Sequence, residues 1–106
     1  MKALEKADKQ DIKIRYATGL AKALEDSPIK SWRKLAKEAG MESAHIQKIS
    51  VGKLDVATTT NVALANALGI TYTALAAYYD AVTDADIDQF LENLKKQKKI
   101  RGKKKP

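Results

Sequence analysis

The sequence predicts an all-α fold, and three of its features support this prediction. Proline occurs only at positions 28 and 106, so few residues interrupt a helix. Glycine at positions 40, 52 and 69 separates segments whose apolar residues recur at helical spacing. No segment shows the alternation and valine or isoleucine enrichment typical of strands. We therefore expect one compact five-helix domain over residues 8–80. Residues 81–106 should add a C-terminal amphipathic helix and a basic tail.

The first two helices are delimited by turn and cap residues. A helix from about Asp8 or Asp11 to Glu25 is predicted by apolar residues every four positions: Ile12, Tyr16, Leu20 and Leu24. The pair Ser27-Pro28 ends this helix, because the residue before a proline disfavours helical angles. The second helix begins after Ser31, a good N-cap, and ends at Gly40.

Three further short helices are expected between residues 42 and 80. One runs from Glu42 or Ser43 to about Val51, with Ile46 and Ile49 on its buried side. The next starts at residues 57–59 and ends at Gly69. Its inward residues are predicted to be Val62, Ala65 and Leu68. Thr71 or Thr73 should cap the last of the three, to which Leu75, Tyr78 and Tyr79 contribute apolar bulk.

The C-terminal segment has acids at its start and lysines at its end, which suits the dipole of a helix beginning near Asp84. Its apolar stripe consists of Ile87, Phe90, Leu91 and Leu94. Packing of this stripe on the chain's own core is the preferred interpretation, and a dimer surface is the alternative. The tip from Gly102 is expected to be disordered.

The charge distribution favours a polyanionic partner. The 106-residue chain has a net charge of +7 and a pI near 9.6. From Asp84 onward, eight basic residues face four acidic ones, and no acid follows Glu92. Nucleic acid is the first partner that such an excess indicates, and an anionic membrane is the second. A solubilising surface would produce the same composition.

Other classes of function find little support in the sequence. The chain has no cysteine, no apolar run of membrane-spanning length and no signal-peptide core, so a cytoplasmic location is expected. His45 is the only histidine, so we expect neither a metal nor a cofactor. Residues 51–55, VGKLD, do not form a phosphate-binding P-loop. We expect no enzyme activity, no small-molecule substrate and no membrane partner.

Three segments in register resemble a known family. They are SWRKLAKEAG (31–40), HIQKISVGK (45–53) and DVATTTNVALANALGI (55–70). Leu20 through Asp80 thereby resembles the helix-turn-helix domain of the phage-repressor and Cro type, the XRE family. The resemblance implies a transcriptional regulator that binds double-stranded DNA. Its recognition helix, at about residues 43–51, would enter the major groove, and two copies would bind as a dimer on two half-sites.

The resemblance also implies a set of contact residues. The base contacts would be Ser43, Ala44, Gln47 and Lys48. The backbone contacts would be Ser31, Trp32, Arg33, His45 and Lys53. Lysine suits guanine, glutamine suits adenine, and alanine can meet a thymine methyl group. A helix cap is the alternative for Ser43, ordinary surface for Gln47 and Lys48, and partial burial for Trp32.

Some positions depart from the family pattern. Trp32 stands where the family commonly has glutamine, Ser50 where it has an acid, and Glu42 where it has a capping serine or threonine. Thr58 and Asn61 occupy positions that are often apolar.

Two other functions therefore stay open. The domain could be a protein-interaction module, such as an antitoxin or bridging factor, because its recognition face lacks arginine. Alternatively, the basic tail Lys95–Lys105 could bind RNA or an anionic membrane; beside a DNA-binding domain it would add salt-sensitive affinity.

Overall fold

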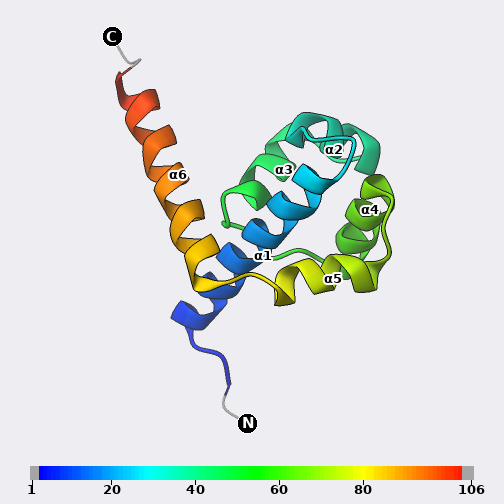
Figure 1. Cartoon of the computed structure of the whole chain (residues 1–106), viewed down its shortest axis with the longest axis horizontal. Helices are drawn as coiled ribbons and strands as arrows, with labels where there is room; N and C mark the ends of the chain where they lie inside the picture. The colour runs from blue at the N-terminus through cyan, green and yellow to red at the C-terminus, as the bar shows by residue number, and fades with distance from the viewer. Residues whose placement is uncertain (1–2, 104–106) are drawn as a thin grey trace.

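The computed structural model describes the backbone of residues 3–103 and the side chains of residues 3–97. Over this range the chain is helical, with no strand, which confirms the all-α class. The helices are α1 (Lys6–Asp26), α2 (Trp32–Ala39), α3 (Ser43–Ser50), α4 (Thr58–Leu68), α5 (Tyr72–Asp80) and α6 (Asp84–Lys103). Figure 1 shows α1 running through the body with α2 to α5 around it, while α6 extends beyond the body.

The core is made of apolar side chains from α1 to α5. The largest of those with almost no exposed surface are Leu20, Leu35, Ile46, Ile49 and Leu64. Burying each such side chain stabilises the fold by about 1.5–3 kcal/mol. The predicted inner positions are confirmed for Leu20 and Leu24 of α1 and for both isoleucines of α3, whereas Ile12 and Tyr16 are only half-buried. Those two helices and α2 share one core, which fixes α3 to the body.

The start of α1 differs from the prediction. The Glu5 amide donates to Asp8 Oδ2 at 3.0 Å, so Asp8 lies within the first turn and the helix begins at Lys6. A carboxylate in the first turn of a helix also interacts favourably with the helix dipole. The end is as predicted, because Ser27 follows the last helical residue and its hydroxyl donates to Leu24 O at 2.6 Å.

The inward side of α4 was predicted incorrectly at Val62, whose side chain is 41% exposed. Leu64, Ala65 and Leu68 are the buried residues of this helix. Asn61 shares their side of the helix and is half-buried. Its Oδ1 accepts from the Tyr16 hydroxyl at 2.7 Å, and its Nδ2 donates to Val56 O at 3.2 Å. Asn61 therefore tolerates its half-buried position because α1 supplies a hydrogen-bond donor to it.

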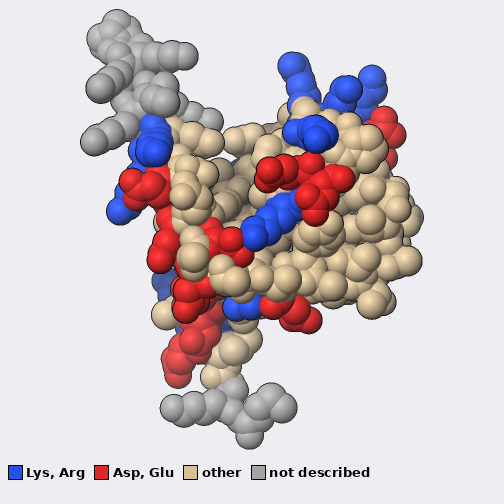
Figure 2. Space-filling view, viewed as in Figure 1, with Lys and Arg blue, Asp and Glu red and all other residues tan. Residues whose placement is uncertain are grey.

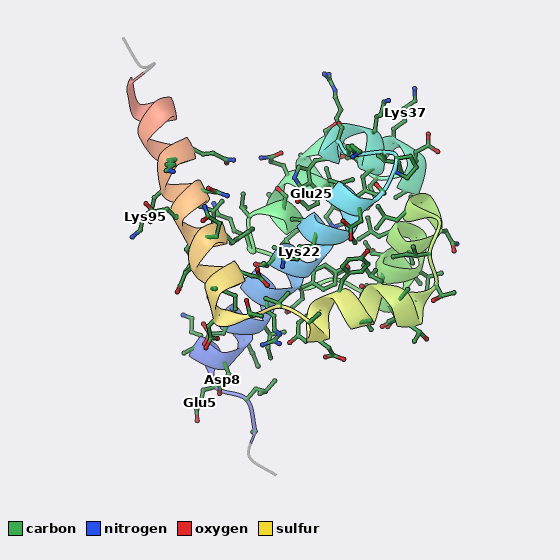
Figure 3. The ribbon with its side chains drawn as sticks, viewed as in Figure 1. Glu5, Asp8, Lys22, Glu25, Lys37 and Lys95 are labelled. Carbon is green, nitrogen blue, oxygen red and sulfur yellow. The ribbon has the colours of Figure 1, made fainter. Side chains whose placement is uncertain are left out.

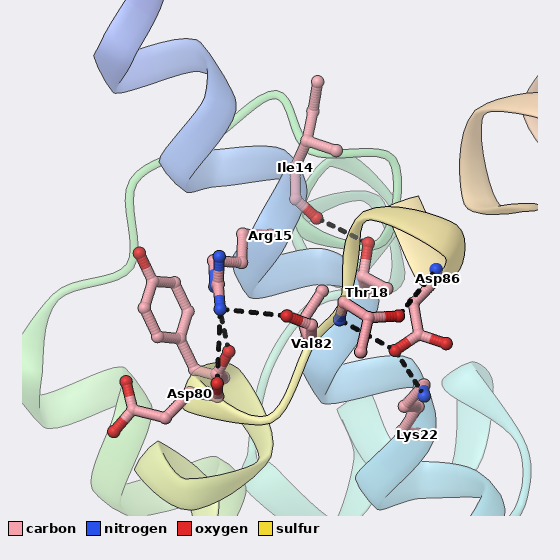
Figure 4. A network of polar contacts seen from close by, with 9 residues as sticks. Ile14, Arg15, Thr18, Lys22, Asp80, Val82 and Asp86 are labelled. Atoms are coloured by element: carbon pink, nitrogen blue, oxygen red, sulfur yellow. Dashed lines mark hydrogen bonds and ion pairs between the residues drawn. The ribbon is translucent and has the colours of Figure 1, made fainter. Parts of the chain in front are cut away.

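α1 and α5 approach each other closely at Gly19. A Cβ atom at this position would lie 3.0 Å from Tyr79 Cα, so only glycine fits without a shift of the backbone. Four residues earlier, Arg15 donates to the carbonyl oxygens of Tyr79, Asp80 and Val82 at 3.1, 3.2 and 2.9 Å (Figure 4). A cation thus binds the negative end of the α5 dipole.

The start of α6 is fixed to α1 by polar contacts. Thr83 precedes α6, and its amide donates to Asp86 Oδ2 at 2.9 Å while its hydroxyl accepts from the Asp86 amide at 3.1 Å. Lys22 Nζ lies 2.7 Å from the same Asp86 oxygen (Figure 4). These contacts attach the first turn of α6 to α1.

The apolar stripe of α6 lies outside the fully buried core. Ile87, Phe90 and Leu94 are half-buried and Leu91 is 37% exposed, while α6 contacts α1. α6 ends at Lys103, and the expectation of disorder from Gly102 stays a prediction. Residues 104–106 lie outside the described range.

Candidate nucleic-acid interface

α2 and α3 are consecutive helices joined by a three-residue turn, residues 40–42. Ser31 caps α2, because its hydroxyl accepts from the Lys34 amide at 3.3 Å. Gly40 ends α2 with φ of 69°, a left-handed conformation that glycine adopts without steric cost. The Met41 amide then donates to Ala36 O at 2.8 Å, which closes the helix end. These local signals are the ones that the sequence predicted.

α3 has two chemically different sides. Ile46 and Ile49 are each 1% exposed and attach the helix to the core. The expected base contacts all lie on the exposed surface of α3: Ser43, Ala44, Gln47 and Lys48. His45 is exposed as well. The expected base contacts are therefore brought together on one accessible helix.

The two ends of α3 are held in different ways. Glu42 is the N-cap residue, and its side chain forms no capping hydrogen bond, so the first turn of α3 has no side-chain cap. Ser50 is buried, and its hydroxyl donates to Gln47 O at 2.7 Å. Ser50 thus ends α3 from within the fold and offers no group to a ligand.

The chain after α3 is held against α1. Gly52 has φ of 77°, and a Cβ atom there would lie 3.1 Å from Ile14 Cγ1. Gln10 Nε2 donates to Gly52 O at 3.1 Å, and the Lys53 amide donates to Lys48 O at 3.1 Å. The side chain of Lys53 is exposed, and these contacts hold its backbone directly beside Lys48.

The three residues expected to contact the DNA backbone at the start of α2 differ in exposure. Arg33 is exposed and available to a partner. Ser31 is half-buried, and its hydroxyl is already used as a cap. Trp32 is half-buried and packs against the core, which favours partial burial over direct DNA contact for this residue. Of these three, Arg33 is the one that presents a free charged group.

Two lysines of α2 were missed by the sequence prediction. Lys34 and Lys37 are exposed, and together with Arg33 they form what we term the α2 basic patch. This patch borders a hollow of about 610 Å³, whose other lining residues include Met41, Glu42 and Ser43. Figure 2 shows basic side chains gathered over α2, and Figure 3 shows Lys37 pointing away from the body. The available signal was helical spacing, because residues 33, 34 and 37 share one side of α2.

A second feature, which the sequence did not reveal, is a groove between α3 and α6. We term it the α3–α6 groove; its volume is about 620 Å³. Ala44, Gln47 and Lys48 line it from α3, while Leu91 and Leu94 line it from α6. Three of the four expected base contacts thus face a space shared with the C-terminal helix.

We also searched the described residues for a metal site and for a membrane-spanning helix. Within residues 3–97, no group of three or more His, Asp or Glu side chains is placed to hold a metal ion. Among the described residues, no single helix has the length and apolar character to cross a membrane. α4 and α5 reach that length and composition only when taken together, and the two are bent by 98° relative to one another. Comparison with protein-family models, curated proteins and solved structures finds no match.

Proposed function

We propose that this protein is a sequence-specific, double-stranded DNA-binding transcriptional regulator with an XRE-type helix-turn-helix domain. The observation that carries the proposal is the two-sided character of α3. Its isoleucines are buried in the core, while Ser43, Ala44, Gln47 and Lys48 are exposed on a helix that follows α2 after a short turn. A helix presented in this way can enter a major groove.

Basic side chains on both sides of α3 support the proposal that this surface binds DNA. The α2 basic patch lies beside the N-terminal end of α3, so Arg33, Lys34 and Lys37 would contact phosphates on one side of the groove. Lys53 follows α3 and would contact a phosphate on the other side. Phosphate contacts of this kind fix the register of a protein on a duplex, whereas base-edge contacts specify the sequence.

α6 would also lie close to a bound duplex, because it borders the α3–α6 groove. Lys95 and Lys96 are exposed on this helix. They would add phosphate contacts that depend on salt rather than on sequence. A dimer would place two copies of α3 about one helical turn of DNA apart, roughly 34–36 Å.

Selection of duplexes from a random pool tests this proposal. We expect an enriched site, and a palindromic site would indicate a dimer. Lys48→Ala should lose roughly 1–3 kcal/mol of discrimination at one base pair. Lys9→Ala, which removes an exposed charge from the first half of α1, serves as the matched control and should leave discrimination unchanged. A pool with no enriched site would contradict sequence-specific binding.

The alternative function is a protein-interaction module of the antitoxin or bridging type. It is favoured by the composition of α3, whose exposed side includes an alanine and no arginine. In that case, a pull-down with the intact chain would recover one stoichiometric protein partner, and the random pool would yield no preferred duplex.

A further inference from the structure

The α3–α6 groove has the size of a small-molecule site. Its volume is about 620 Å³, and ligand pockets commonly measure roughly 300–1,000 Å³. Three parts of the fold form its walls: α3 with the residues that follow it, the first half of α1, and the middle of α6. Figure 1 shows α6 leaving the body at its start and continuing past α3.

The inner surface of the groove is largely apolar. Its apolar side chains come from three helices and from the residue after α3: Ile14, Ala44, Val51, Leu91 and Leu94. None of these belongs to the fully buried core, and Leu91 is 37% exposed. An apolar group that entered the groove would remove this surface from water, which is the main driving force for binding at such sites.

The charged residues of the groove are all basic. Lys48 and Lys53 lie at the end of α3, where the hydrogen bond from the Lys53 amide to Lys48 O holds them side by side. Lys95 borders the groove from α6, although Figure 3 shows its side chain on the outer side of that helix. Among residues 3–97, whose side chains are described, no acidic residue lines the groove. An anionic group would therefore be attracted to the Lys48–Lys53 end.

We propose that the α3–α6 groove binds a small amphipathic anion: an apolar chain or ring system between α3 and α6, with a carboxylate or similar group at Lys48 and Lys53. This proposal is independent of the function proposed above. One consequence of it does rest on that function. The ligand would cover Ala44, Gln47 and Lys48, so ligand and DNA would exclude one another.

Dodecanoate, used below its micelle concentration and without DNA, is a suitable probe of the site. In an amide-resolved NMR titration of the full chain, we expect saturable shifts at Ala44, Val51, Leu91 and Leu94. Dodecyltrimethylammonium has the same chain and the opposite charge, and it should bind much more weakly. Equal binding of the two compounds, or shifts spread over the buried core, would overturn the proposal.

Two matched variants keep the result specific to the groove. Leu91→Glu places a carboxylate inside it and should weaken dodecanoate binding at least roughly tenfold, because an apolar site disfavours an unpaired charge. Val62→Glu makes the same kind of change at a similarly exposed residue of α4, and it should leave binding unchanged. Equal effects of the two substitutions would exclude the groove as the binding site.

Competition with DNA is measured last, on the duplex selected from the random pool. Dodecanoate should release that duplex from the wild-type chain and much less from Leu91→Glu. If dodecanoate binds in the groove and the duplex stays bound, mutual exclusion is wrong while the site stands. If no duplex is selected but dodecanoate binds, the proposed function fails and the site again stands.

Discussion

Lys22 Nζ lies 2.7 Å from Asp86 Oδ2, and this ion pair joins the C-terminal third of α1 to the first turn of α6. Lys22, together with the Thr83 amide on the same carboxylate, lowers the pKa of Asp86 to about 2 from its usual value of 3.8. The pair is partly exposed, so its main role is to fix where α6 begins rather than to stabilise the whole fold. The direction of α6 in turn determines one wall of the α3–α6 groove.

Asp86→Asn should make the chain less stable at neutral pH, and the difference from wild type should vanish in acid. Because the folded-state pKa is lowered, the contribution of Asp86 is complete above the unfolded value of 3.8 and is lost as the pH falls towards about 2. Urea unfolding at pH 7, 4 and 2 measures this difference. Asp88→Asn changes an exposed carboxylate of the same helix and serves as the control. A difference that does not vary with pH would contradict the ion-pair assignment.

Gly19→Ala should destabilise the protein, although alanine is the better helix former by about 1 kcal/mol. The added Cβ would lie 3.0 Å from the backbone of α5, and relieving such overpacking typically costs about 1–3 kcal/mol. Thermal and urea unfolding measure the change. Glu25→Ala, on the exposed side of α1, should alter stability by less than about 0.5 kcal/mol. A stabilised Gly19→Ala variant would show that α1 and α5 are farther apart than described.

Replacing Arg33 and Lys37 together with alanine should weaken binding to every duplex by the same factor. Phosphate contacts carry no sequence information, and each contributes about 0.9 to the slope of log affinity against log salt concentration. The double variant should therefore reduce the slope by nearly 2 and leave the selected site unchanged. A change in site preference would assign one of these residues to a base edge instead.

Truncation after Leu94 should flatten the salt dependence of DNA binding and retain the selected site. It removes the basic end of α6 and keeps Leu91 and Leu94 in the α3–α6 groove. Binding to random duplex at increasing salt concentration gives the slope, and a slope equal to that of the full chain would remove these lysines from the proposed interface.

The parts of the fold that the sequence predicted well are determined by neighbouring residues. Ser31 and Gly40 delimit α2 through bonds to residues three or four positions away, and the isoleucine spacing of α3 follows from helical geometry alone. The exposure of the proposed base contacts follows from the same spacing. Their contact with DNA stays a prediction, as do the boundary near residue 80 and the dimer.

The features that escaped prediction depend on residues far apart in the chain. Asn61, and not the predicted Val62, lies on the inward side of α4. Tyr16, 45 residues away from Asn61, supplies the hydroxyl group that binds it there. The need for glycine at position 19 arises from the backbone of Tyr79, 60 residues later in the chain. The α3–α6 groove depends on the position of α6, whose first turn contacts α1 through an ion pair between residues 22 and 86. No local pattern encodes any of these three relationships.

The contacts of Arg15 have a consequence for the order in which the protein is made. Its three carbonyl acceptors lie 64 to 67 residues later in the chain, so a ribosome has translated α2, α3 and α4 before any of them exists. Domains generally fold as units, and contacts between distant segments form late. A nascent chain that ends at Ile70 contains none of the three acceptors, so the α5-binding side of α1 is still uncovered at that stage. Attachment of α5 to Arg15 and Gly19 would then complete the domain once α5 has left the ribosome, at the end of synthesis.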